Sequence, residues 1–178
     1  MLTFDAGVAM ADAALHAGLT TLDQLREALE RRRDWAGAAS AARVVEFADG
    51  RSQSVGESRL RVGYARQGLP RAVPQVPVRT RIGVFHPDLL IVELMVASEF
   101  DGDIKYRPAN ASAASPASVD RAAAAVVLAE KRRENALREA GVEVVRVIWA
   151  ELDDEAALAE QVRAAGRLAM LRHGREAG

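Results

Sequence analysis

Residues 88–101 read DLLIVELMVASEFD, a mostly apolar stretch with acidic residues at both ends. The stretch is long enough for two buried strands, and we predict that the chain turns near 93–95. In that arrangement Asp88 opens one strand and Glu99 ends its antiparallel neighbour, so the two carboxylates lie side by side at one end of the sheet. Glu99 and Asp101 are two residues apart on an extended strand, and their side chains therefore project to the same face.

The segments that flank this stretch predict an α/β fold, in which helices cover a mixed β-sheet. One helix ends at Gly68-Leu69-Pro70, because Gly adopts the left-handed conformation after a helix and Pro stops it. A later, long helix ends at Gly141. The elements predicted outside 88–101 are a helix at 54–67, extended segments at 74–79 and 81–85, a low-complexity loop at 107–118, a helix at 118–140, a strand at 142–149 and a helix at 151–173.

Residues 5–49 predict a helical segment in front of this α/β domain. Alanine is abundant there, and leucine recurs at spacings of three to four residues. Thr21 and Gln24 form a capping-box pattern that starts one helix, and a further helix covers 38–48. We therefore divide the chain into a helical segment at 1–50, an α/β domain at 51–173 and a disordered tail at 174–178.

The composition excludes several classes of protein. The chain has 178 residues, a formal net charge of -1 and no cysteine. Disulfide scaffolds, thiolate zinc sites and cysteine nucleophiles are therefore excluded. No apolar run approaches the roughly 18 residues of a membrane span, and the N-terminus lacks the basic and apolar regions of a signal peptide. These features predict a cytoplasmic protein that makes no membrane contact.

Asp88, Glu99 and Asp101 are candidate metal ligands. Three carboxylates at one strand end repel one another unless a cation neutralises them. A site made of oxygen ligands suits Mg²⁺ or Mn²⁺. The alternative is that these acids lie where a strand end meets water, and their spacing leaves both interpretations open. Glu57 also has two interpretations: it completes a capping box with Ser54, or it presents a fourth acid to the same end of the sheet.

The long helix carries polar residues on the face that should be buried. With Val126 and Leu137 as anchors, the inward stripe passes through Glu130 and Arg133. Two polar residues on a buried stripe require partners or a wet cleft. Lys105, just past the apolar stretch, could hold a phosphate or the attacking water, or it could be an exposed loop lysine.

A basic run precedes the apolar stretch. Between residues 51 and 81 the chain has one acid, Glu57, and seven arginines, at positions 51, 59, 61, 66, 71, 79 and 81. Cleavage of a polyphosphate chain requires an acidic metal centre beside a basic rim, with the metal at the scissile phosphate and arginines on its neighbours. The run is equally consistent with a solvated helix face.

Taken together, the motifs resemble a known group of nucleases. They are Ser54-x-x-Glu57-Ser58-x-Leu60, Asp88, Glu99-Phe100-Asp101-Gly102-x-x-Lys105, Glu130-Lys131-Arg132-Arg133-Glu134, Leu137, Gly141, and Val144 to Val147 with Trp149. Over residues 51–150 the sequence is similar to the Vsr-like branch of the PD-(D/E)XK nucleases, and more closely to the C-terminal domain of bacterial AbiEi-type antitoxin proteins. The resemblance implies a restriction-endonuclease-like mixed sheet flanked by helices.

The resemblance also assigns roles to individual residues. It implies that Asp88 and Glu99 bind Mg²⁺ or Mn²⁺ with Asp101 beside them, and that Glu57 is the acid on the helix before the sheet. Lys105 takes the final position of the motif, where relatives have His, and Asp101 stands where the usual motif has Lys. The implied catalytic set is Glu57, Asp88, Glu99, Asp101 and Lys105. The implied contacts to nucleic acid come from Arg59, Arg66, Lys131 and Arg133.

Three functions remain open at this point. The first is metal-dependent hydrolysis of nucleic-acid phosphodiester bonds, in DNA rather than RNA. In the second, the domain is catalytically inactive and serves as an antitoxin or transcriptional regulator in a phage-defence or toxin–antitoxin operon, with DNA or a cognate toxin as its partner. In the third, residues 5–50 form an oligomer or docking surface and the acids are incidental.

Overall fold

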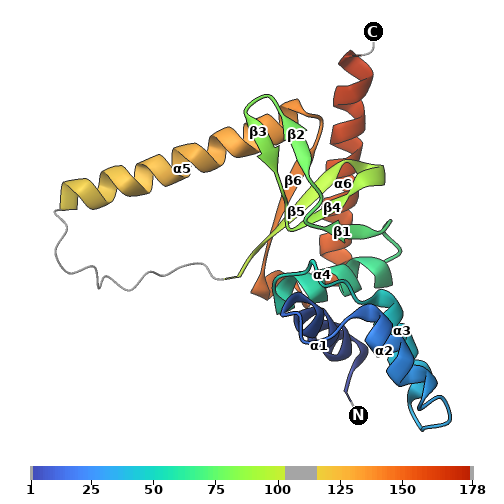
Figure 1. The fold of residues 1–178 in the computed structure, drawn as a ribbon. Helices are drawn as coiled ribbons and strands as arrows, with labels where there is room; N and C mark the ends of the chain where they lie inside the picture. The colour runs from blue at the N-terminus through green and yellow to red at the C-terminus, as the bar shows by residue number, and fades with distance from the viewer. Residues whose placement is uncertain (1, 103–115, 177–178) are drawn as a thin grey trace.

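The computed structural model describes the backbone of residues 2–102 and 116–176, and the side chains of residues 2–102, 125 and 127–172. Within these residues the chain forms six α-helices, a mixed four-stranded sheet and a small two-stranded sheet (Figure 1). The predicted α/β fold, a mixed sheet flanked by helices, is confirmed. Most of the predicted loop at 107–118 falls outside the described residues, and its last three residues already belong to a helix.

Three helices form the N-terminal segment. Thr21 starts the second helix with the predicted capping box: its hydroxyl accepts a hydrogen bond from the Gln24 backbone, and the Gln24 side chain accepts one from the Thr21 backbone. The helical interpretation of this segment is therefore confirmed. The three helices are α1 (Phe4–His16), α2 (Leu22–Glu30) and α3 (Ala38–Phe47).

A buried polar cluster joins α1 to α4 (Val55–Arg66), the first helix of the α/β part. The Asp12 carboxylate accepts hydrogen bonds from the Ser58 hydroxyl at 2.7 Å, the Arg61 guanidinium at 2.8 Å and the Asp49 backbone N–H at 2.7 Å. Arg61 also donates to the backbone carbonyl of Phe47 at 3.3 Å. Both oxygens of the buried carboxylate thus have partners, which is what burial of a charge requires.

The main sheet has the strand order β1-β4-β5-β6. β1, β4 and β5 are antiparallel, and β6 pairs parallel to β5 through a crossover that contains the long helix α5 (Pro116–Glu139). A parallel pair requires such a crossover. The strands are β1 (Ala72–Pro74), β4 (Leu89–Ile91), β5 (Val96–Asp101) and β6 (Glu143–Ile148).

The apolar stretch folds into the two predicted strands. A 3-10 turn at Val92–Leu94 connects β4 to β5, and Met95 after it adopts a left-handed φ of 53°. Leu89 pairs with Ser98 and Ile91 with Val96. The turn expected near 93–95 is thus confirmed. The extended segment predicted at 74–79 is divided in the structure: Pro74 ends β1, and Gln75 turns the chain with a φ of 54°. The hairpin that follows consists of β2 (Val78–Thr80) and β3 (Gly83–Phe85).

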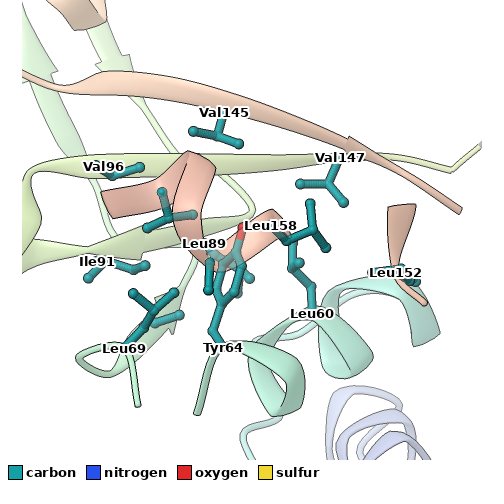
Figure 2. Close-up of a cluster of buried hydrophobic side chains, with 13 residues drawn as sticks. Leu60, Tyr64, Leu69, Leu89, Ile91, Val96, Val145, Val147, Leu152 and Leu158 are labelled. Carbon is teal, nitrogen blue, oxygen red and sulfur yellow. The ribbon is translucent and has the colours of Figure 1, made fainter. Parts of the chain in front are cut away.

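Side-chain alternation along the strands supplies a core on each face of the sheet. On one face, α4 and α6 (Glu155–Glu176) pack against side chains of β4, β5 and β6, as Figure 2 shows. On the other face, Leu90 and Ala97 pack with Leu137 near the end of α5 and with Val78 of the hairpin. The first core includes Leu60, Tyr64, Leu69, Leu89, Ile91, Val96, Val145, Val147, Leu152 and Leu158.

One polar contact crosses the first core. The Tyr64 hydroxyl lies 3.0 Å from the Ser98 hydroxyl, and both side chains are buried. Burial raises the pKa of Tyr64 to about 12, so the phenol stays neutral. The contact fixes α4 against β5 one residue before Glu99.

The C-terminal elements differ slightly from their predicted bounds. Residues 149–151 form a 3-10 turn, so the last helix begins at Glu155 rather than at 151. That helix continues through Glu176, whereas the sequence predicted a disordered tail from 174. Among the described helices, none contains a stretch long and apolar enough to cross a membrane.

Candidate acidic site

The hairpin of β4 and β5 brings three of the predicted acids to one end of the sheet. Asp88 directly precedes β4, and its carboxylate accepts a hydrogen bond at 2.8 Å from the backbone N–H of Phe100. Glu99 and Asp101 flank Phe100 on β5. The predicted proximity of Asp88 and Glu99 is confirmed. These acids line a polar cavity of about 250 Å³, together with Phe100, Glu130, Arg133 and Arg146.

Arg133 of α5 neutralises Glu99. Its guanidinium binds both carboxylate oxygens; one contact, from Nη1 to Oε2, measures 3.2 Å. The same guanidinium lies 5.7 Å from the centre of the Phe85 ring and 3.7 Å from the Glu130 carboxylate. Glu130 and Arg133, the two polar residues on the inward stripe of the long helix, thus face a polar cavity that supplies their partners. This explains why they interrupt the apolar pattern.

Arg146 is a member of this cavity that the sequence analysis missed. It lies in the middle of β6 and pairs with Glu130, and its guanidinium is 3.6 Å from Glu134. These carboxylates raise the pKa of Arg146. The available signal was the single charged residue inside the apolar run VVRVI at 144–148. A charge at the centre of a strand indicates a partner on the helix that covers it.

Glu99 remains harder to ionise than an ordinary glutamate. Burial is the largest cause of its raised pKa, and the charges of Asp88 and Glu130 raise it further. The charges of Arg133 and Arg146 act in the opposite direction. The ion pair with Arg133 therefore offsets only part of the burial and of the repulsion between the acids.

Glu57 caps the start of α4 and is not among the residues that line the acidic cavity. One carboxylate oxygen accepts from the Ser54 hydroxyl and the other from the Gln53 backbone N–H, each at 2.9 Å, while the Ser54 hydroxyl accepts from the Glu57 backbone. Ser54 and Glu57 thus cap the start of α4, but the backbone partner of the Glu57 carboxylate is Gln53, whereas a capping box would use the backbone N–H of Ser54 itself. Burial and the charge of Asp88 raise the pKa of Glu57, so it also lies within the field of the acidic site.

The side-chain atoms at this site that can bind a metal are carboxylate oxygens, which suit a divalent cation such as Mg²⁺. Among the described side chains, however, no three acids or histidines converge as a ready set of metal ligands. Glu99 is occupied by Arg133, and Asp88 holds the Phe100 backbone. The residues therefore fit a cation only when the Glu99–Arg133 ion pair opens. Lys105 lies outside the described residues.

None of the seven arginines of the basic run lines the acidic cavity. Six of the seven pair with carboxylates that do not line the acidic cavity, and Arg79 has no ion pair among the described residues. The pairs are Arg51 with Asp49, Arg59 with Asp153, Arg61 with Asp12, Arg66 with Asp5 and Glu155, Arg71 with Asp49 at 3.9 Å, and Arg81 with Glu139.

The residues expected to contact nucleic acid are accordingly dispersed. Arg133 lies in the acidic cavity, and Lys131 is exposed on α5. Arg66 is the last residue of α4, and Glu57 lies in the first turn of the same helix. Arg59 lies 6.0 Å from the ring of Trp149.

An exposed aromatic residue borders the acidic cavity and was not assigned a role from the sequence. Trp149 packs edge to face on Phe100, with ring centres 5.0 Å apart at 87°. Phe100 in turn lines the cavity. The ring pair therefore lies beside a cavity whose own lining is almost entirely polar.

Comparison of this chain with protein-family models, with curated proteins and with solved structures finds no match.

Proposed function

We propose that the acidic cavity hydrolyses phosphodiester bonds of nucleic acid, DNA in the first instance, with Mg²⁺ or Mn²⁺ held by Asp88 and Glu99. The observation that carries this proposal is the placement of two adjacent carboxylates at an open end of the sheet, where their mutual repulsion contributes to the raised pKa of Glu99. A divalent cation would relieve that repulsion.

In this proposal the cation supplies a Lewis acid at the scissile phosphate. Arg133 leaves Glu99 and turns to a phosphate oxygen, for which a guanidinium is well suited. Asp101, exposed at the end of β5, orients the attacking water. Glu57 keeps its capping role and holds α4 beside Asp88. Lys105 is assigned the stabilisation of the charge that develops on the phosphate.

The test is nicking of supercoiled plasmid by the full chain in Mg²⁺ or Mn²⁺. We expect activity that chelation abolishes, and loss of about 100-fold or more in Asp88→Asn and Glu99→Gln, because each removes a carboxylate from the cation. Glu160→Gln, an exposed glutamate on α6, is the matched control and keeps wild-type activity. Wild-type nicking no greater than that of Glu99→Gln, with both proteins folded by circular dichroism, would overturn the proposal.

The ion pair between Glu99 and Arg133 favours a second candidate function. A carboxylate neutralised by arginine does not need a metal, so the same cavity suits a catalytically inactive protein that binds DNA or a protein partner, as an antitoxin or operon regulator would. DNA affinity that is independent of divalent cations, with no nicking, would support this second function.

Arg133→Gln separates the two functions. If the site binds a cation, removing the competing guanidinium raises the affinity for Mn²⁺, measured by titration calorimetry, while nicking falls. If the ion pair is the permanent state of the site, neither the wild type nor Arg133→Gln binds Mn²⁺ in the millimolar range, roughly the weakest binding of biological use.

A further inference from the structure

A second, larger cavity lies where the N-terminal helices meet the α/β part of the chain. It has a volume of about 790 Å³ and is formed by α1, α3, α4 and the start of β1. Ligand sites commonly have volumes of roughly 300–1,000 Å³ and occur where two parts of a chain meet. This cavity shares no lining residue with the acidic site.

Arginine is the most frequent charged residue in the lining of this cavity. Four arginines contribute to it, and Glu46 is the acid among the lining residues. The arginines come from three different elements and are Arg43 of α3, Arg61 and Arg66 of α4, and Arg71 before β1. A concave surface lined by one sign of charge concentrates ligands of the opposite sign.

The four arginines are not equally engaged. Arg61 is buried, and its guanidinium is held by Asp12 and the Phe47 carbonyl. Arg66 is held by Asp5 and Glu155.

The other two arginines are exposed at the mouth of the cavity. Arg71 lies 3.9 Å from Asp49, a carboxylate that Arg51 already binds at 2.7 Å, and Arg43 makes no ion pair with any described carboxylate. Arg43 and Arg71 are therefore the lining arginines that remain most available to an anionic ligand, with Glu46 as the one carboxylate in the lining.

The inner wall of the same cavity is aromatic and apolar. Phe4 and Phe47 pack edge to face with ring centres 5.7 Å apart, and the Arg61 guanidinium lies 4.9 Å from the Phe47 ring. Leu69 and Ala72 complete this wall. A ligand that fits such a lining has a flat, largely apolar part and an anionic group, which is the chemistry of a nucleotide.

We propose that this cavity binds a nucleotide unit, with its base against Phe4 and Phe47 and its phosphate between Arg43 and Arg71. The nucleotide is either free or part of a nucleic-acid strand, since both present the same base and phosphate. The proposal does not rest on catalysis at the acidic site, because the residues of the two sites are separate.

Titration calorimetry on the full chain tests the proposal, with AMP, adenosine and inorganic phosphate as probes. We expect AMP to bind at least about tenfold more tightly than either adenosine or phosphate, because it alone engages both walls. Arg43→Gln and Arg71→Gln each weaken AMP binding by about tenfold, as expected for the loss of a charged hydrogen bond. Arg79→Gln, an exposed arginine outside the cavity, and Asp88→Asn at the acidic site leave AMP binding unchanged.

A single-stranded oligonucleotide identifies the source of the nucleotide. Displacement of AMP by the oligonucleotide, weakened in Arg71→Gln, supports the proposal with a strand as the ligand. AMP binding with no displacement supports it with a free nucleotide as the ligand. Two results would overturn the proposal. The first is that neither AMP nor the oligonucleotide binds, and the second is that Arg43→Gln, Arg71→Gln and Arg79→Gln have equal affinities for AMP.

Discussion

Two ion pairs between arginine and a carboxylate define the two polar regions of this protein, and they differ in their access to solvent. In the junction between α1 and α4, the side chains of Asp12 and Arg61 are 1% and 3% exposed. In the acidic cavity, the side chains of Glu99 and Arg133 are 13% and 27% exposed. The chemistry of the two pairs is the same, but their surroundings are different.

The partners around each pair explain the difference. Asp12 has its remaining hydrogen bonds supplied by Ser58 and by the Asp49 backbone, so both of its carboxylate oxygens have protein partners. Glu99 faces a cavity that holds further acids, and its pKa is raised in spite of Arg133. We conclude that the first pair is structural, and exchange of the second pair's partner for a ligand is what the proposed function requires. Four predictions test this distinction.

The largest effect is expected at the junction. Asp12→Ala leaves the Arg61 guanidinium buried without its counter-charge, which should lower the free energy of unfolding by about 3–5 kcal/mol. Urea denaturation followed by circular dichroism measures the change. A loss below about 1 kcal/mol would show that the junction tolerates an uncompensated charge and that the pair is not structural.

A smaller effect is expected where α4 meets Phe100, beside the acidic cavity. A Cβ atom at Gly56 would lie 2.0 Å from Cε1 of Phe100, so Gly56→Ala must displace that ring. We expect a loss of about 1–3 kcal/mol, together with a change in Trp149 fluorescence because Phe100 packs on its indole.

Gly63→Ala is the matched control on the same helix. Its Cβ would meet the Glu155 Cγ atom at 3.3 Å, a contact that the flexible side chain can relieve. This variant should be neutral or stabilised by up to about 1 kcal/mol, since alanine favours the helix over glycine. Equal losses in both variants would mean that Phe100 is not held in place by α4.

The pH dependence of stability follows from the raised pKa of Glu99. The folded protein holds this proton more tightly than the unfolded chain, so the resulting stability is present below the ordinary glutamate pKa and is lost as pH rises through the raised value. Glu99→Gln removes this loss. The stability of the variant relative to wild type should therefore increase between about pH 4 and pH 7, measured by urea denaturation. A constant or opposite difference would contradict the sign of the shift.

The smallest effect is expected for a surface pair of the same chemistry. Arg26 and Asp23 on α2 lie 3.0 Å apart with side chains 62% and 86% exposed. Asp23→Ala should change the free energy of unfolding by less than about 0.5 kcal/mol, because water already solvates both charges. A loss comparable to that of Asp12→Ala would remove burial as the explanation of the comparison.

The features that the sequence predicted correctly depend on residues that are near one another in the chain. Ser54 and Glu57 form a cap because three residues separate them on a helix start. Asp88 and Glu99 meet because the turn between their strands is short, and strand alternation then fixes which side chains share a face. Both inferences require only local geometry.

The partners of the arginines could not be predicted in the same way. Arg61 pairs with an acid 49 residues earlier in the chain, and Arg66 with acids 61 residues earlier and 89 later. Nothing in the pattern of residues 51–81 indicates which distant carboxylate will reach them. The excess of arginine in that run therefore predicted a basic rim. In the folded chain, ion pairs with carboxylates from other segments neutralise most of that charge.

The parallel pairing of β5 with β6 has a consequence for how the chain folds. One edge of β5 pairs with β4. Its other edge pairs with β6, which begins only at Glu143. During synthesis on the ribosome, the hairpin of β4 and β5 is complete while that edge is still unpaired, and α6, which covers Ile91 and Val96, emerges later still. An unpaired apolar edge is a template for aggregation. We expect the nascent chain to depend on chaperones until β6 has been made, and closure of this long-range pair to limit the refolding rate.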